Sequence, residues 1–279
     1  MSIEKYASIN GIRICYEDQG KGEPVILIHG IGAKKETWVA QFDALSVHFR
    51  VIAFDMRGVG KSDRPNEPYT MKILADDVKG LMDYLNIKAA HIIGRSLGGM
   101  VAQHFALNYP DYLQKLVLLT TNPQIPDEKA AEFIKNGRIE EIKQLAEDPK
   151  KSFWQKSKLL FHKDFRKEMK ADPKKNFYGI WSVEDLIAEC IKDPSTPQDI
   201  TNLSNALRSH DIIGKLHLIR NETLLISGTH DRLTPKSSMI EIHKRIPNST
   251  LHIIENTGHF LHLSRAPEVN RLIINFLKN

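Results

Sequence analysis

The sequence predicts an α/β fold in which a mostly parallel sheet carries helices on both faces and is interrupted by an inserted helical cap. Short apolar runs alternate with helix-like segments along most of the chain, which is typical of parallel sheets. The alternation stops at residue 122 and resumes near residue 212. We therefore expect a core of residues 1–121 and 212–279 and a cap of residues 122–211. A chain of 279 residues is long enough for one such core with an insertion.

The first elements are expected to be an edge hairpin and two buried strands. Segments 6–9 and 12–16 flank Asn10-Gly11, which tolerates the positive φ of a two-residue hairpin turn. Segments 25–28 and 51–54 are apolar at every position, as expected of parallel strands that are covered on both faces. Further strands are predicted at 91–93, 116–120, 223–227 and 250–254.

Helices are expected between these strands. Thr70 can cap a helix that runs to residue 85 and carries its apolar residues on one face. A helix that starts at the turn 94–98 should end before Pro110, because proline cannot continue it. Trp38 is expected to be a core residue in a helix after the first buried strand. Other helices are predicted at 235–245 and 267–277, and the cap is expected to be helical with breaks at Pro149, Pro173, Pro194 and Pro197.

The charge balance excludes a strongly basic nucleic-acid binder. The chain has 39 basic and 34 acidic residues, a formal charge of +5. Within residues 150–175, ten basic residues face three acidic ones. We interpret this stretch as a solvated helix face, and attraction of anionic substrates or membrane surfaces is the alternative.

The sequence gives no sign of export, a membrane span or a disulfide framework. No run of about 18 apolar residues occurs, and the N-terminus lacks the basic and apolar regions of a signal peptide. We therefore expect a cytoplasmic protein. Cys15 and Cys190 lie in separate segments and are expected to be reduced thiols.

A candidate nucleophile lies in the sequence Gly94-Arg95-Ser96-Leu97-Gly98, between a predicted strand and a predicted helix. In that position the serine occupies a sharp turn that only glycine-sized neighbours permit, and its hydroxyl is exposed at the carboxyl end of the sheet. The alternative is a glycine-rich turn of a nucleotide-binding fold, whose phosphate-binding spacings are absent here.

A serine hydroxyl needs a base to remove its proton and an acid to orient that base. Asp231 and His259 each follow a predicted strand, so both should lie on loops at the same edge as Ser96. Asp127 is the alternative acid, although it lies several residues beyond its strand. Alternatively, Asp231 could be an acid at a helix N-terminus, stabilised there by the helix dipole, and His259 could be a structural loop residue.

Acyl transfer also needs N–H donors for the developing oxyanion. The segment His29-Gly30-Ile31-Gly32 follows the first buried strand, and we assign the backbone N–H groups of Ile31 and Leu97 to this role. A metal site is not expected, because the histidines lack carboxylate or thiol partners at ligand spacing.

Four residues are candidate substrate contacts: Arg95, Trp154, Phe161 and Trp181. The three aromatic residues belong to the predicted cap, where they could line a pocket or serve only for packing. Arg95 is expected to be a solvated or ion-paired side chain. The alternatives are that it favours an anionic acyl group or lowers the proton affinity of the serine.

Taken together, these motifs resemble the α/β-hydrolase superfamily. The resemblance rests on His29-Gly30, the segment 55–62, the serine turn, the segment 228–235 and Gly258-His259. It implies an eight-stranded, mostly parallel sheet, a cap inserted after the sixth strand and no organic cofactor. Within the superfamily the chain is similar to small esterases, enol-lactonases and carbon-carbon bond hydrolases. Dehalogenases and epoxide hydrolases of this fold use an aspartate at the turn, so Ser96 argues against both.

The sequence therefore predicts a serine hydrolase that cleaves a small-molecule carboxylic ester or lactone through an acyl-enzyme. Ser96 would attack, His259 would transfer the proton and Asp231 would orient the imidazole. Three alternatives remain open: a carbon-carbon bond hydrolase of keto-acids or diketones, an acyltransferase, and a ligand receptor that retains the triad. No nucleic acid, membrane or metal partner is expected.

Overall fold

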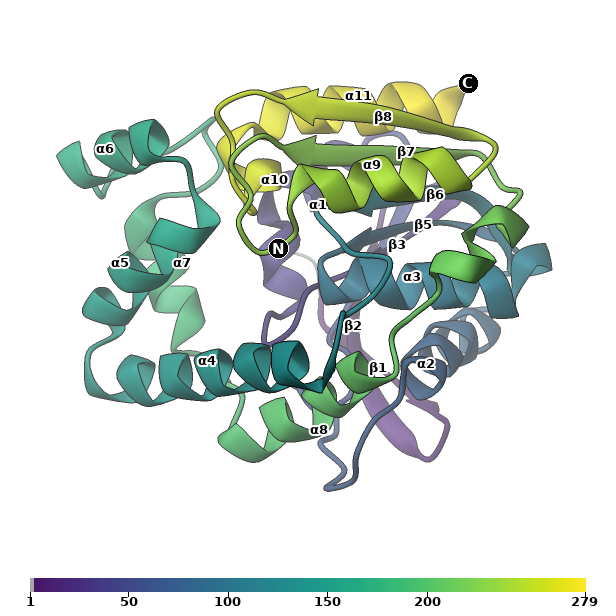
Figure 1. Ribbon diagram of the computed structural model, residues 1–279, viewed down its shortest axis with the longest axis horizontal. Helices are drawn as coiled ribbons and strands as arrows, with labels where there is room; N and C mark the ends of the chain where they lie inside the picture. The colour runs from purple at the N-terminus through teal and green to yellow at the C-terminus, as the bar shows by residue number, and fades with distance from the viewer. Residues whose placement is uncertain (1–2) are drawn as a thin grey trace.

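The computed structural model describes residues 3–279 and contains one eight-stranded sheet (Figure 1). Its strands lie in the order β1-β2-β4-β3-β5-β6-β7-β8. The pairs β1–β2 and β2–β4 are antiparallel and every other pair is parallel, which confirms the mostly parallel sheet. The strands are β1 (Lys5–Ile9), β2 (Ile12–Gln19), β3 (Pro24–Ile28), β4 (Arg50–Phe54), β5 (Ala90–Arg95), β6 (Leu113–Leu119), β7 (Thr223–Gly228) and β8 (Ser249–Ile254).

The N-terminal hairpin forms as the sequence predicts. Asn10 and Gly11 have φ values of 48° and 75°, so both turn residues are left-handed, as a tight hairpin requires. The pairing Ile9↔Ile12 closes the turn and β1 forms the edge of the sheet.

Helices cover both faces of the sheet (Figure 1). Neighbouring residues of a strand point to opposite faces, so Ile26 and Ile28 pack on one side while Val25 and Leu27 pack on the other. This double burial explains why β3 is apolar at every position. One face carries α2 (Met71–Tyr84), α3 (Leu97–Asn108) and α9 (Lys236–Arg245), and the other carries α1 (Val39–Ser46), α10 (Leu261–Ser264) and α11 (Ala266–Lys278).

The helix expected around Trp38 consists of the 3-10 helix η1 (Lys35–Trp38) and α1. Three short elements were not predicted: α10 and the 3-10 helices η2 (Pro110–Tyr112) and η3 (Ile213–Leu218). Trp38 ends η1, directly before α1, and is fully buried as expected. Strand β6 also starts three residues earlier than its apolar run, at Leu113.

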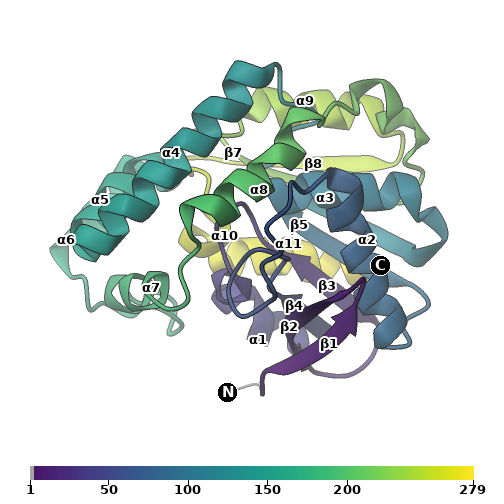
Figure 2. The same cartoon turned by 90° about the horizontal axis from the view of Figure 1, so that it is seen from below.

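Residues 122–211, called the helical insertion below, join β6 to β7 and contain five helices. These are α4 (Glu128–Glu147), α5 (Pro149–Leu160), α6 (Lys163–Ala171), α7 (Val183–Cys190) and α8 (Pro197–Arg208). The insertion lies beside the carboxyl ends of the parallel strands (Figures 1 and 2). The helices break at the four prolines, as predicted. Pro149 and Pro197 begin the helices that follow the breaks, because the first turn of a helix does not use their missing N–H.

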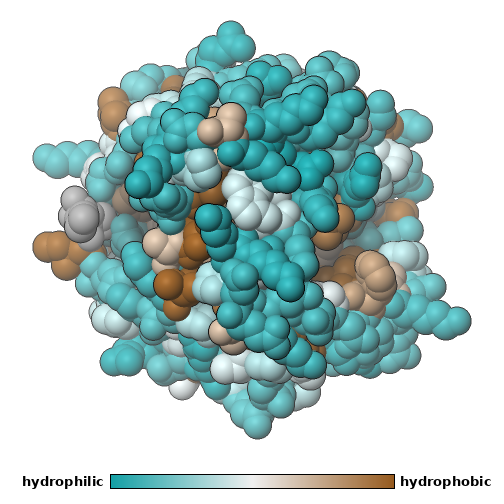
Figure 3. All heavy atoms as spheres, turned by 90° about the vertical axis from the view of Figure 1, so that its left-hand side faces the viewer, coloured by the Kyte–Doolittle hydropathy of each residue, from teal (hydrophilic) through white to brown (hydrophobic). Residues whose placement is uncertain are grey.

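An aromatic cluster packs the insertion against the core. Phe161, Phe177 and Trp181 are buried together, and Trp181 stacks on Phe177 with ring centroids 4.8 Å apart. The outer side of the insertion is mostly hydrophilic, with small hydrophobic patches between the polar side chains (Figure 3). Cys15 and Cys190 are unpaired. Within residues 3–279, no helix is both long and apolar enough to cross a membrane.

Candidate active site

The Ser96 turn is strained in the way that its glycines allow. Ser96 has φ 56° and ψ −121°, which is unusual for a residue with a side chain. A Cβ at Gly94 would lie 2.3 Å from the Gly98 carbonyl oxygen, and a Cβ at Gly98 would lie 2.1 Å from the Ile28 carbonyl oxygen. Only glycine fits at both positions. Ser96 precedes α3, and its hydroxyl caps no N–H of that helix.

Asp231 and His259 form a buried hydrogen-bonded pair. The Nδ1–H of His259 donates to Asp231 Oδ2 over 2.8 Å. The Thr234 hydroxyl donates to the same oxygen, and the N–H groups of Leu233 and Thr234 donate to Oδ1. Burial alone would raise the pKa of Asp231, but His259 and the Thr234 hydrogen bonds lower it below its ordinary value. Asp231 is therefore an anion that fixes the proton of His259 on Nδ1 and leaves Nε2 free to accept one.

Thr120 connects the serine turn to the histidine loop. The N–H of Ser96 donates to the Thr120 carbonyl, and the Thr120 hydroxyl donates to the His259 carbonyl. The loops after β5, β6 and β8 thus meet at the carboxyl edge of the sheet, where Asp231 also lies. Within residues 3–279 the His259 ring is hydrogen-bonded to Asp231 and Thr234 and not to the Ser96 hydroxyl.

The alternative acid, Asp127, lies at the start of α4 and caps that helix. Its side chain caps α4 by accepting the N–H of Ala130 over 2.8 Å. It is therefore a helix-capping residue of the insertion.

The loop after β3 holds the Gly30–Ile31 peptide in one orientation. The Gly30 carbonyl accepts the N–H of Ala33 and the Nδ1–H of His29. Because the peptide is planar and trans, the N–H of Ile31 points the opposite way. His29 Nε2 accepts the N–H of Met56, and burial lowers the pKa of His29 to about 4. His29 is thus a neutral structural residue of this loop.

Leu97 is the first residue of α3, where N–H groups have no acceptor within the helix. Its N–H and that of Ile31 come from two segments that touch, since a Cβ on Gly30 would lie 3.2 Å from Ser96 Cβ.

A cavity of about 140 Å³ lies between the insertion and the loop after β3. Its lining includes Gly32 and Thr37 from the core and the apolar side chains of Phe153, Leu160 and Phe260. Phe153 and Leu160 were not singled out from the sequence, because a lysine-rich helix gives little sign of which residues face inward.

The predicted aromatic contacts occupy the packed region next to this cavity. Phe161 and Trp181 are buried and stacked in the aromatic cluster, and Trp154 packs partly buried against it. Trp181 also lines a larger groove of about 600 Å³, between α7 and the segment from η1 to α1. Contact of these three residues with a substrate stays a prediction.

Arg95 differs from the main expectation. Its side chain is neither solvated nor ion-paired: only 2% is exposed, and within residues 3–279 no carboxylate lies within ion-pair distance. The sequence could not reveal this, because the strand that carries Arg95 ends beneath two loops from distant parts of the chain.

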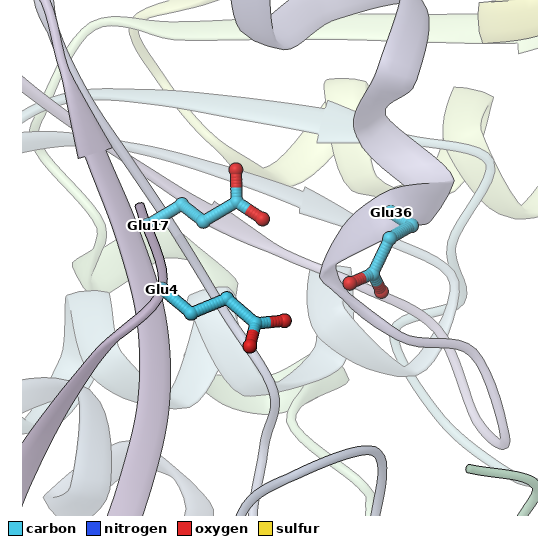
Figure 4. A group of neighbouring side chains, drawn as sticks. All are labelled: Glu4, Glu17 and Glu36. Carbon is cyan, nitrogen blue, oxygen red and sulfur yellow. The ribbon is translucent and has the colours of Figure 1, made fainter. Parts of the chain in front are cut away.

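Three glutamates gather beside the first strands in a way that the sequence did not suggest. Glu4, Glu17 and Glu36 each bring a carboxylate oxygen within 4.8 Å of the others (Figure 4). Oxygen ligands of this kind suit a hard cation. Here the Lys35 ammonium supplies positive charge, at 3.2 Å from Glu4, 2.5 Å from Glu36 and 3.6 Å from Asp55. The group is therefore a charge cluster built around Lys35.

The alpha/beta hydrolase fold family model matches residues 23–266, so this chain belongs to that family of hydrolases. A solved hydrolase from Pseudomonas aeruginosa PA01 is 28% identical, covers 99% of this chain and 98% of its own, and has a TM-score of 0.83. The fold and family that the sequence motifs implied are thereby confirmed.

Two curated relatives carry names that point to different substrates. The putative carbamate hydrolase RutD of Caulobacter sp. (strain K31) is 29% identical, with 91% of this chain and 90% of its own aligned. The 2-hydroxy-6-oxo-6-phenylhexa-2,4-dienoate hydrolase of Comamonas testosteroni is also 29% identical, with 95% and 91% aligned. Family membership therefore defines a hydrolase and leaves its substrate open.

Proposed function

We propose that this chain is a serine hydrolase that cleaves carboxylic esters or lactones through an acyl-enzyme. The observation that carries the proposal is the buried Asp231–His259 pair, held at the sheet edge where the strained turn presents Ser96. A hydroxyl, an imidazole and an orienting carboxylate are the groups that acyl transfer requires.

In the proposed reaction, Ser96 Oγ attacks the carbonyl carbon while His259 Nε2 takes its proton. Asp231 stabilises the imidazolium, and the N–H groups of Ile31 and Leu97 bind the oxyanion. His259 then gives the proton to the leaving alkoxide, so that the ester bond breaks and the acyl group stays on Ser96. A water molecule then attacks the acyl carbon while His259 takes its proton. The bond to Ser96 breaks, His259 returns the proton to Ser96 Oγ, and the acid is released. In a lactone the leaving alkoxide is part of the same molecule.

The helical insertion is proposed to act as a lid over this site. The lining of the cavity beneath it combines the apolar side chains of Phe153, Leu160 and Phe260, which suit an apolar acyl or leaving group, with charged side chains such as Arg138 and Glu141. The name of the relative from Caulobacter also refers to a carbonyl substrate, a carbamate, which supports attack at a carbonyl carbon.

A fluorophosphonate probe tests the nucleophile. Attack by Ser96 would form an oxygen–phosphorus bond and expel fluoride, so the wild type should label stoichiometrically and lose activity. The Ser96→Ala variant should not label. Ser237→Ala is the matched control, because Ser237 is an exposed serine on α9 and its removal should leave labelling unchanged. Full labelling of the Ser96→Ala variant would refute the assignment.

Carbon-carbon bond hydrolysis is a second candidate, because the relative from Comamonas is named as a dienoate hydrolase. Steady-state turnover of nitrophenyl esters of increasing acyl length, of lactones and of a vinylogous 1,5-diketone separates the two. The ester and lactone proposal expects the diketone to be the poorest substrate. A diketone turned over far faster than every ester would favour the second candidate.

A further inference from the structure

Arg95 is a buried cation that forms no ion pair within residues 3–279, although the more distant charge of Asp231 attracts it. It ends β5 with 2% of its surface exposed, and its Nε has no hydrogen-bond partner within residues 3–279. Burying an unpaired charge costs several kcal/mol, so buried arginines are ordinarily paired with a carboxylate. Packing alone therefore does not explain why a charged side chain is buried at this position.

The guanidinium lies directly against the loop after β3. A Cβ on Gly30 would lie 3.2 Å from Arg95 Nη2, so no side chain separates the cation from the Gly30 backbone. On its other side, Arg95 Cζ lies 4.5 Å from the centroid of the Phe260 ring, a cation–π contact that replaces part of the lost hydration. Phe260 follows His259 in the chain, so Arg95 lies between the loop after β3 and the loop after β8.

A second guanidinium approaches the same loop from the helical insertion. Arg138 Nη2 donates to the carbonyl of Ile31, and Arg138 also pairs with Glu141 at 2.6 Å. Arg138 is therefore ion-paired, with a carboxylate that it shares with Lys156, whereas Arg95 has no ion pair within residues 3–279. Burial and the charge of Arg138 lower the pKa of Arg95 to about 9 against the attraction of Asp231, so Arg95 keeps its charge at neutral pH.

We propose that Arg95 is a positioning residue whose charge, held against Gly30, stabilises the oxyanion bound by the N–H groups of Ile31 and Leu97. This inference rests on the proposed serine-hydrolase function. The substrate carbonyl is neutral in the ground state and becomes negative in the transition state. The interaction therefore strengthens during the reaction and should act on kcat rather than on KM.

The expected size follows from Coulomb attraction. At the effective dielectric constant of about 20 found in proteins, two unit charges roughly 6 to 12 Å apart correspond to a rate change of about 100- to 10-fold. The effect should be insensitive to salt, because a buried charge is poorly screened.

The test compares Arg95→Met, which removes the charge at similar length, with Arg95→Lys, which keeps it. On a neutral nitrophenyl ester, the R95M variant should lose 10- to 100-fold in kcat with KM within about twofold of the wild type. The R95K variant should recover most of the loss. Arg271→Met, an exposed arginine on α11, controls for net charge and should have no effect. Binding of a boronic acid, whose serine adduct mimics the tetrahedral anion, should weaken in parallel with kcat.

Two further measurements separate this role from a structural one. Loss of an unpaired buried charge should leave the Tm of the R95M variant unchanged or raise it, whereas loss of a structural arginine would lower it. A buried lysine loses its proton more easily than an arginine, so the activity of the R95K variant should fall at a lower alkaline pH than that of the wild type. This pH profile remains decisive if the R95M variant does not fold.

These outcomes distinguish a failure of the proposed role of Arg95 from a failure of the proposed serine-hydrolase function. A folded R95M variant with wild-type kcat overturns the role of Arg95 alone. A loss confined to KM for carboxylate-bearing esters also overturns it, because Arg95 would then bind substrate directly. Absence of both turnover and fluorophosphonate labelling in the wild type overturns the proposed function and this inference together.

Discussion

The core and the helical insertion bury their residues to very different extents. In the core, α3 buries nine of its twelve residues, whereas α4 of the insertion buries only Ala131 among twenty. The strands of the core are covered on both faces, while the burial of the insertion is concentrated in the aromatic cluster and in α8, whose Ile200, Leu203 and Leu207 join the main core. The groups proposed for chemistry are thus held by the densely packed part of the molecule.

Polar contacts join the two regions along several segments, and they include backbone hydrogen bonds from the Tyr69 N–H to the Asn202 carbonyl and from the Phe260 N–H to the Leu160 carbonyl. Lys34 pairs with Glu189 at 2.7 Å, Arg64 pairs with Asp199 at 3.0 Å, and Arg138 bonds the Ile31 carbonyl. Ion pairs with partly exposed partners contribute about 1 kcal/mol or less each. The aromatic cluster and the apolar face of α8, which packs into the main core, should therefore dominate the attachment of the insertion to the core.

The largest expected effect comes from exchanging an acid of the core. Asp231→Asn removes the charge that orients His259, so kcat should fall by about 10⁴-fold while the fold persists. Asp127→Asn is the matched change in the insertion. Asparagine also caps helices well, so activity and stability should both stay near wild type. Steady-state kinetics with thermal melts measures both variants. Near-normal activity of the D231N variant would show that another group orients the base.

The strands and the candidate triad could be predicted from the sequence because both follow from local patterns. Apolar runs fix the strands, and Ser96, Asp231 and His259 each lie just after one of them. The sheet then gathers them at one edge. The helices of the insertion could not be delimited in this way. Helix α4 has one buried residue, and its apolar residues Ile134, Ile139 and Ile142 are only partly buried among many charged ones, so its inner face is weakly marked in the sequence.

Contacts between distant segments were also beyond prediction. Arg138 and Ile31 are 107 positions apart, and nothing local to either residue indicates their hydrogen bond. The burial of Arg95 depends in the same way on Gly30 and Phe260, which come from opposite ends of the chain.

A second prediction asks whether the insertion unfolds separately from the core. Trp181→Ala removes the stacking on Phe177 and leaves a cavity in the aromatic cluster, at an expected cost of about 3–5 kcal/mol. If the loss stays local, proteolysis should cut first within residues 128–208 while Ser96 still reacts with the fluorophosphonate probe. Phe133→Ala, at a position that is 79% exposed on α4, is the control and should be neutral. Simultaneous loss of labelling and of core structure would show one cooperative unit.

A third prediction concerns a histidine pair where the insertion ends. His104 of α3 and His210 lie with ring nitrogens 3.1 Å apart, and burial lowers the pKa of both to about 4. The unfolded chain binds protons near pH 6.5 and the folded pair does not. The contribution of the pair to the free energy of unfolding should therefore be fully present above pH 6.5. It should be lost as the pH decreases towards 4, by about 1.4 kcal/mol per pH unit for each histidine.

Urea unfolding at several pH values between 7 and 4.5 measures this dependence. The His210→Gln variant should show a shallower slope by about one proton. His217→Gln, at an exposed position, should keep the wild-type slope. Equal slopes for all three proteins would mean that the pair does not control acid sensitivity.

The smallest expected effect concerns the basic surface of residues 150–175 in the insertion. Lys150, Lys158 and Lys174 are exposed, so their field is screened by salt over about 10 Å at 0.1 M ionic strength and about 3 Å at 1 M. Replacing all three with glutamine should lower kcat/KM for a carboxylate-bearing ester by less than about threefold, and the difference should vanish at 1 M salt. A neutral ester should be unaffected. Surface charge on the insertion would then act only on the approach of anionic substrates, while the buried charge of Arg95 would act on the reaction at any salt concentration. An equal, salt-independent loss on both esters would instead place the lysines in contact with the reacting site.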